Sequence, residues 1–176
     1  MKFRTIFTIA SICFFAIGCK TETAKDYNDM IVKKQKNLAQ SIDENEPKLR
    51  NYFASNEYDS IASISGRMEA KIDSMINDIR NKPAPKVTQG ENFKKAALNY
   101  LDYMKTLYTT YKNYGLATTP EARIVGRVIM SRVTSQEDKM IAEMQQAQRI
   151  FAKDNGFKIK PAVKQGGSYT ANPPNQ

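Results

Sequence analysis

Histidine and tryptophan are absent from this chain of 176 residues, and cysteine occurs only twice. Without histidine, the chain lacks the usual metal ligand and the usual general base near neutral pH. The Glu-x-x-His motif of di-iron four-helix bundles is excluded for the same reason. No glycine-rich phosphate loop and no Gly-x-Ser-x-Gly nucleophile motif occurs either. We therefore expect no cofactor, no metal site and no catalytic residue.

The start of the chain has the layout of a secretory leader. Lys2 and Arg4 precede an apolar run over residues 6–17, after which come Gly18 and Cys19. The run is too short to cross a bilayer of about 30 Å as a stable helix, which favours cleavage over a permanent anchor. A cysteine directly after a small residue at this point is typical of a bacterial lipobox. An ordinary secreted protein with a chance cysteine there is the alternative.

This layout predicts a lipoprotein. Residues 1–18 are expected to be a signal peptide that is removed, and Cys19 to be the lipid attachment site. Residues 19–25 then form a short lipidated tether, and acyl chains such as palmitate hold the protein on a membrane. The expected location is the bacterial cell envelope at the outer membrane, on its periplasmic face or at the cell surface. Cys13 leaves with the signal peptide, so no disulfide can form within the mature chain.

Basic residues exceed acidic ones, with 27 lysines and arginines against 18 aspartates and glutamates. Removing Lys2 and Arg4 with the signal peptide leaves 25 basic residues, a net charge of +7 against the same 18 acids. Such a charge could favour an anionic lipid or polymer. The basic residues are scattered among acids on helix faces, however, so solubility explains them as well. Nucleic acid is not an expected partner.

Apolar residues recur at steps of three and four along most of the chain, which predicts helices. Pro47 should kink the first helix or break it briefly near residues 45–47. Two prolines and a glycine predict an irregular loop at 81–90. Gly156 should end the last helix in a left-handed conformation, with Phe157 folding back on its final turn. The expected helices span residues 26–54, 58–81, 91–114 and 120–154.

Four amphipathic helices with one apolar face each must bury those faces together. The predicted fold is all-α, an antiparallel up-down four-helix bundle over residues 26–157. A flexible N-terminal tether precedes it, and a disordered tail at 158–176 follows. The stretch 133–135 is a poor helix former that could bend the fourth helix. The inward face of that helix is expected to comprise Ile124, Val125, Val128, Ile129, Val133, Met140, Ile141, Met144, Ala147 and Phe151.

Tyrosines of the third predicted helix are the first candidates for binding. Such rings can grip a sugar or a protein, because they are apolar and carry a polar hydroxyl. Tyr103 and Tyr114 are expected to be exposed, whereas the tyrosines at 100, 108 and 111 fit the core. On the fourth helix, Arg123 and Arg127 lie one turn apart and could hold an anionic group. A solvated charged face is the alternative for both arginines.

Two further groups have simpler explanations. Glu69 and Asp73 lie one turn apart and could share a proton or bind a cation. No third ligand is apparent, so a plain charged surface is favoured. The methionines at 68, 75, 104, 140 and 144 fit a helical core better than a soft-metal site.

Several phrases resemble small all-helical lipid-anchored surface proteins of Bacteroidetes and spirochaetes. They are residues 24–29 (AKDYND), 75–79 (MINDI), 93–98 (FKKAAL) and 147–157 (AQRIFAKDNGF). The resemblance covers residues 24–158 and implies a helical protein of the envelope. It carries over no catalytic residue.

Three functions remain open at this stage. The leading hypothesis is a non-enzymatic envelope lipoprotein that binds an envelope protein or an anionic surface polymer. The second is a carrier for a small ligand, with a pocket between helices lined by Tyr100, Tyr108 and methionines. The third is a hydrolytic enzyme, which would need a carboxylate pair with shifted pKa values in a cleft. The sequence does not determine the oligomeric state.

Overall fold

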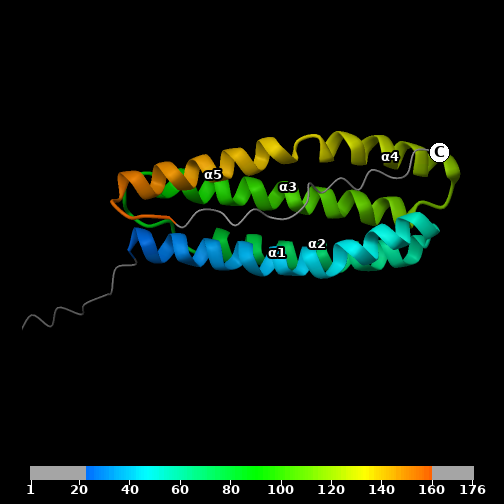
Figure 1. Ribbon diagram of the computed structural model, residues 1–176, viewed down its shortest axis with the longest axis horizontal. Helices are drawn as coiled ribbons and strands as arrows, with labels where there is room; N and C mark the ends of the chain where they lie inside the picture. Colours follow the sequence, from blue (N-terminus) through cyan, green and yellow to red (C-terminus); the bar gives the residue numbers. More distant parts are fainter. Residues whose placement is uncertain (1–22, 160–176) are drawn as a thin grey trace, which may run out of the picture.

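The computed structural model describes residues 23–159, which form a bundle of helices (Figure 1). The helices are α1 (Ala24–Ser55), α2 (Tyr58–Asn81), α3 (Gly90–Leu116), α4 (Pro120–Thr134) and α5 (Glu137–Asp154). Successive rods run in opposite directions, and α4 and α5 together make the fourth rod. The predicted all-α, up-down four-helix bundle is therefore confirmed. The predicted signal peptide, the predicted lipid-attachment residue Cys19 and the predicted tail beyond residue 159 lie outside the described residues.

The first helix runs without interruption through Pro47. Proline cannot donate to the carbonyl one turn earlier, that of Asp43, but both residues are exposed and water can reach the carbonyl. Of the kink and the short break that the sequence left open, the break is absent. A capping box between Thr23 and Asp26 starts the helix, so two residues of the predicted tether, Ala24 and Lys25, are helical.

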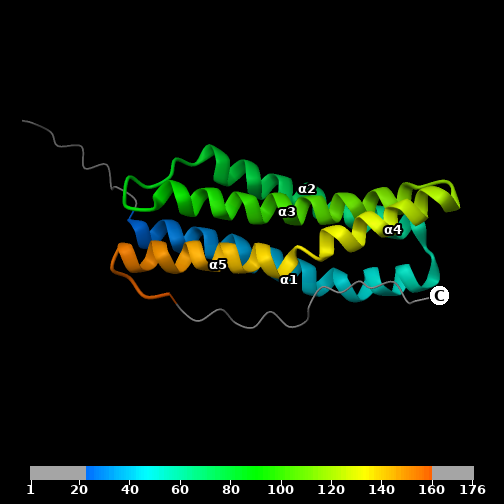
Figure 2. The ribbon, with the colours of Figure 1, turned by 90° about the horizontal axis from the view of Figure 1, so that it is seen from above.

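The fourth rod is divided, as Figure 2 shows near its middle. We expected one long helix with a bend, but α4 ends at Thr134 and α5 begins at Glu137. The Thr134 hydroxyl donates to the Met130 carbonyl at 2.8 Å, and the Ser135 hydroxyl donates to the Arg132 carbonyl at 2.8 Å. These side chains compete with the backbone for helical acceptors, and Val133, Thr134 and Ser135 are successive weak helix formers, which favours an interruption at this place.

The core lies between all four rods. Phe93 of α3 stacks on Phe151 of α5 at 4.7 Å between ring centroids, and Tyr27 of α1 meets the edge of Phe93. Four of the five methionines named above, at 68, 75, 104 and 144, are buried, and Met140 is half-buried. This placement supports their role as core residues.

The end of α5 has the predicted conformation. Gly156 has a φ of 71°, and the Phe157 amide donates to the Ala152 carbonyl at 3.1 Å. The Phe157 ring lies 5.8 Å from that of Phe151, so the chain folds back on the last turn as expected.

Helix α4, the first half of the fourth rod, buries only one of its residues, Met130. Helix α3 contacts α2, α4 and α5, and α1 contacts α2 and α5. Helix α5 therefore packs against two neighbours, α3 and α1, whereas α4 packs mainly on α3. A helix held by a single neighbour buries only one narrow face.

Candidate functional site

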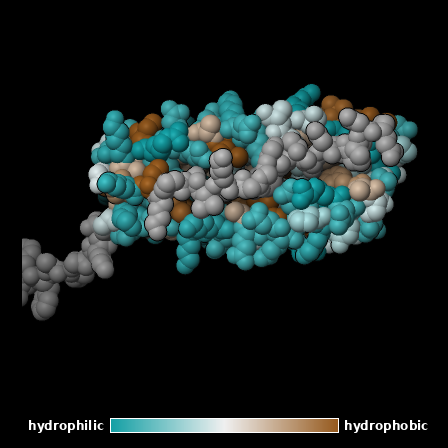
Figure 3. Space-filling view, viewed as in Figure 1, coloured by the Kyte–Doolittle hydropathy of each residue, from teal (hydrophilic) through white to brown (hydrophobic). Residues whose placement is uncertain are grey.

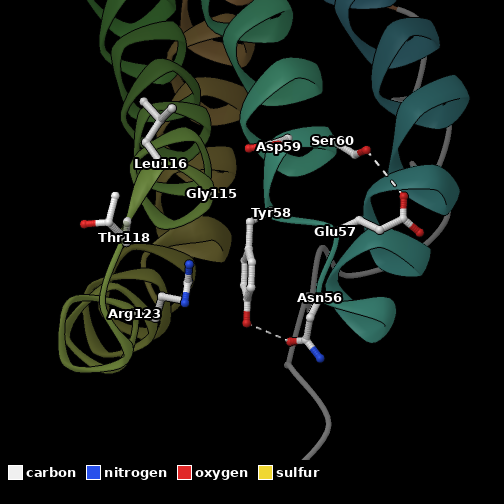
Figure 4. A pocket seen from close by; sticks show the side chains of 10 residues that line it. Asn56, Glu57, Tyr58, Asp59, Ser60, Gly115, Leu116, Thr118 and Arg123 are labelled. Carbon is white, nitrogen blue, oxygen red and sulfur yellow. Dashed lines mark hydrogen bonds between the residues drawn. The ribbon is translucent and has the colours of Figure 1, made fainter.

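An open cleft lies at the end of the bundle where the α1–α2 turn meets the α3–α4 connection (Figure 4). Its volume is about 650 Å³. Both walls come from helix ends and turns. The lining residues are Asn56, Glu57, Tyr58, Asp59, Ser60, Gly115, Leu116, Ala117, Thr118 and Arg123.

Tyr58 and Arg123 form the polar centre of the cleft. The Arg123 guanidinium carbon lies 3.7 Å from the centroid of the Tyr58 ring, close enough for a strong cation–π contact. The Tyr58 hydroxyl donates to the Asn56 side-chain oxygen at 3.1 Å, which fixes the ring (Figure 4). Asn56 itself ends α1 in a left-handed conformation, with a φ of 58°. A tight turn thus positions the aromatic surface on which the arginine rests.

One donor of Arg123 is unused. Its Nε atom is buried and has no hydrogen-bond partner among the described residues. A buried guanidinium donor without an acceptor is unfavourable, and a ligand oxygen could satisfy it. The acidic residues Glu57 and Asp59 also line the cleft, and the Glu57 carboxylate points away from Arg123 toward Ser60 (Figure 4). An acidic ligand should therefore bind on the side of the cleft where Arg123 lies.

A second arginine–tyrosine pair lies next to the cleft. The Nε and one terminal nitrogen of Arg127 donate to the Tyr114 hydroxyl at 3.4 and 3.3 Å. The Tyr114 ring lies 5.9 Å from that of Tyr58. Of the four predicted binding residues, the fold therefore brings three together at one end of the bundle: Tyr114, Arg123 and Arg127.

The predicted exposure of Tyr103 and Tyr114 is wrong. Only 7% of Tyr103 and 2% of Tyr114 is accessible. Both belong to α3, which contacts α2, α4 and α5, so its buried face is wide enough to enclose tyrosines beside the central stripe, while Asn99, Asp102 and Thr106 on the other side stay exposed. Tyr103 is also remote from the cleft lining, and burial raises its pKa well above the ordinary value, with a smaller effect of the nearby Glu137 carboxylate.

The inward face predicted for the first half of the fourth helix is also wrong. Ile124, Val125, Val128 and Ile129 are exposed at 63, 58, 57 and 44%. The side that α4 turns toward α3 carries Met130 instead, with Gly126 against the Tyr114 ring. Figure 3 shows apolar side chains on the edge of the molecule where α4 lies, on an otherwise mostly hydrophilic face. We call these four exposed residues the α4 apolar face.

The carboxylates of Glu69 and Asp73 act as structural ion-pair partners. Glu69 pairs with Lys112 and accepts a hydrogen bond from the Thr109 hydroxyl at 2.6 Å. Asp73 pairs with Lys105 at 2.6 Å. Each pair joins α2 to α3, which agrees with the charged-surface alternative. No group of three or more metal-ligating side chains occurs within residues 23–159.

Two cleft residues, Tyr58 and Leu116, were missed as binding candidates. Tyr58 is half-buried, because its helix begins at this residue. The signal available was its position at the boundary between two helices, opposite a second boundary at residues 116–120. Helix ends place side chains over the edge of a bundle rather than between its rods.

Comparison with protein-family models, curated proteins and solved structures finds no match. The cleft and the α4 apolar face are therefore interpreted from their own chemistry. Among the described residues, none of the helices is both long and apolar enough to span a bilayer.

Proposed function

We propose that this protein is a non-enzymatic lipoprotein of the bacterial envelope that binds an acidic group of a protein or surface polymer in the Tyr58–Arg123 cleft. The lipid anchor is Cys19, on the outer membrane at its periplasmic face or at the cell surface. The observation that carries the binding proposal is the unpaired, buried Nε of Arg123 in an open cleft. An acidic oxygen is the ligand that this donor lacks.

The position of the cleft in the bundle supports this proposal. Helix α1 has 32 residues and is therefore about 48 Å long at a rise of 1.5 Å per residue. The cleft is lined by residues of the turn that follows its C-terminal end, whereas the proposed anchor, Cys19, precedes its first residue in the sequence. The bundle thus separates the binding end from the anchored end.

The cleft favours a macromolecular partner over an enclosed small ligand. The carrier hypothesis requires a cavity lined by Tyr100 and Tyr108, but both side chains are buried in the core and neither lines the cleft. The cleft is open and bounded by turns, so an acidic side chain or a polymer segment can enter without unfolding the bundle.

Metabolic labelling tests the anchor. A fatty acid such as palmitate should label the wild-type protein, and Cys19→Ala should abolish the label. Equal labelling of both proteins would refute lipidation at this residue.

Site-specific photocrosslinking in intact cells tests the cleft. A photoreactive amino acid at Leu116, an exposed cleft residue, should capture one partner reproducibly. Arg123→Ala should reduce the captured product at least tenfold, because it removes the hydrogen-bond donor that binds the acidic group. Arg67→Ala is the matched control, since Arg67 is an exposed arginine of α2 outside the cleft. Equal loss in both variants, or none in either, would contradict the proposed role of Arg123.

A further inference from the structure

The α4 apolar face has a palindromic pattern of side chains. Reading outward from the point between residues 126 and 127, Val125 mirrors Val128 and Ile124 mirrors Ile129. One turn farther out, Glu121 mirrors Arg132. In each pair the two positions lie equally far from the centre. The pattern is therefore self-complementary when a second α4 helix approaches in the opposite direction.

All six residues lie on the outward side of one helix. The four aliphatic residues are 44–63% exposed, and Glu121 and Arg132 are exposed as well. Glu121 and Arg132 are eleven positions apart, which is about three turns at 3.6 residues per turn, so both lie in line with the apolar side chains. Arg123, Gly126 and Met130 occupy the opposite side, toward the bundle.

We infer that the α4 apolar face is the contact surface for a second copy of this chain, packed antiparallel about a two-fold axis. In such an interface residue i contacts residue j, and j contacts i in return. Ile124 then packs on the second copy's residue 129, Val125 on its residue 128, and Glu121 pairs with its Arg132. The dimer has two equivalent ion pairs flanking a continuous apolar seam.

Charge complementarity distinguishes this occupant from others. Neither Glu121 nor Arg132 has an ion-pair partner within residues 23–159, so both are available at opposite ends of the seam. The helix dipole favours an acid at the start and a base at the end of a helix. It does not explain why both lie on the outward side in line with the apolar residues, whereas antiparallel self-pairing does.

The size of the face predicts a weak dimer in solution. Helix α4 has 15 residues, so it is about 22 Å long. One helix face of that length buries less than the roughly 1,200 Å² of a standard interface. Confinement of the protein to a membrane surface would raise its effective concentration and favour the dimer.

Cysteine crosslinking of the full chain in cells tests the geometry. Two differently tagged copies are co-expressed, one with Glu121→Cys and the other with Arg132→Cys. We expect at least tenfold more disulfide between unlike copies than between two Glu121→Cys or two Arg132→Cys copies. In the antiparallel dimer, like positions lie about 16 Å apart along the helix axis, from 11 residues at 1.5 Å each. More product between like positions, or no product above the wild-type background, would overturn the proposal.

Charge reversal provides an independent test by sedimentation velocity. Glu121→Arg or Arg132→Glu alone should weaken association at least tenfold, because each places like charges opposite one another. The double reversal should restore the association constant to within threefold of the wild-type value. Circular dichroism confirms that the variants are folded. Failure of the double reversal to restore association in folded protein would count against the pairing.

Ile129→Glu and Ile150→Glu form a matched pair for the apolar seam. The two isoleucines are exposed to similar extents, 44 and 40%, but Ile150 lies on α5. Only Ile129→Glu should abolish the dimer, and equal effects of both would contradict the assignment. None of these variants changes the cleft, so partner crosslinking through Arg123 and dimer formation can fail separately.

Discussion

Gly115 of α3 lies directly against the backbone of Tyr58 in α2. A β-carbon at Gly115 would come within 2.5 Å of the Tyr58 carbonyl oxygen and 2.6 Å of the Ala62 amide nitrogen. Only glycine allows the two helices to approach this closely at the wall of the cleft. Gly115 itself is helical, and its lack of a side chain is required for this close packing.

Replacing this glycine tests the close approach. Gly115→Ala should destabilise the protein by about 1–3 kcal/mol, because a backbone contact cannot yield without moving a helix. Gly66→Ala is the matched control: its β-carbon would meet only the Lys112 side chain at 3.5 Å, so improved helix propensity should stabilise by about 0.5–1 kcal/mol. Urea denaturation measures both. The two substitutions should change the free energy of unfolding in opposite directions. No change for Gly115→Ala would contradict the packing argument.

The cation–π contact in the cleft should contribute measurably to stability. A double-mutant cycle with Arg123→Ala and Tyr58→Leu should give a coupling free energy of about 0.5–1 kcal/mol. The same cycle with Arg67→Ala and Tyr58→Leu should give a value near zero, since Arg67 hydrogen-bonds to Ser63 in its own helix. Coupling of similar size in both cycles would show that the effect does not come from the stacked guanidinium.

Buried tyrosines should make the protein sensitive to alkali. Burial, with a smaller contribution from the Glu137 carboxylate, raises the pKa of Tyr100 to about 12. The unfolded value is about 10, so folding favours the neutral phenol. Its stabilising contribution is complete below pH 10 and is lost as the pH rises toward 12.

Denaturation at a series of pH values between 9 and 12 checks this expectation. The free energy of unfolding should fall less over this range for Tyr100→Phe than for the wild type. The difference between the two losses should be at most about 2–3 kcal/mol. Part of the dependence should remain, because burial also raises the pKa of Tyr103 and Tyr111. Parallel pH profiles for wild type and variant would contradict the prediction.

The Glu69 carboxylate should contribute to stability in the opposite pH range. Hydrogen bonds from Lys112 and Thr109 lower its pKa. Its contribution is therefore present above the unfolded value of about 4.3 and is lost as the pH falls through the lower folded value. At pH 7, Glu69→Gln should cost about 0.5–1 kcal/mol, since the pair is partly exposed.

Glu143→Gln provides the control for this ion pair. Glu143 is half exposed and lies 3.9 Å from Lys139 within the same helix, so its replacement should change the free energy of unfolding by less than about 0.5 kcal/mol. Thermal or urea denaturation at pH 7 and pH 3 compares the two. A larger effect of Glu143→Gln would contradict the assignment of Glu69 as the structural partner.

Most of the bundle could be predicted because local rules and packing agree. The α2 stripe of Ile61, Met68, Ile72 and Ile76 is buried as its period indicates, and Thr119 caps α4 with Pro120 in the first turn. The effect of Pro47 was less predictable. The free-energy cost of a proline within a helix depends on whether the carbonyl that loses its amide donor, here that of Asp43, reaches water. That in turn depends on which side of α1 faces the core.

The candidate site was only partly predictable. Arg123 and Arg127 were identified from their spacing, but their partners Tyr58 and Tyr114 come from other helices. Hydrophobic periodicity identifies an apolar side of a helix, yet it does not count the neighbours available to cover it. Hence the stripe on α4 was assigned to the core although it faces outward, and Tyr103 and Tyr114 were assigned to the surface although they are enclosed.

The sequence by itself determined most of the helical segments, the end of the last helix at Gly156 and the up-down order of the rods, because these depend on backbone preferences and short connections. The tertiary structure alone decided which apolar faces are covered. A helix with three neighbours, such as α3, buries a wide face, whereas α4 rests mainly on α3 and leaves Ile124, Val125, Val128 and Ile129 exposed. Whether an apolar helix face is buried depends on how many other helices pack against it, and the local pattern of residues does not specify that number.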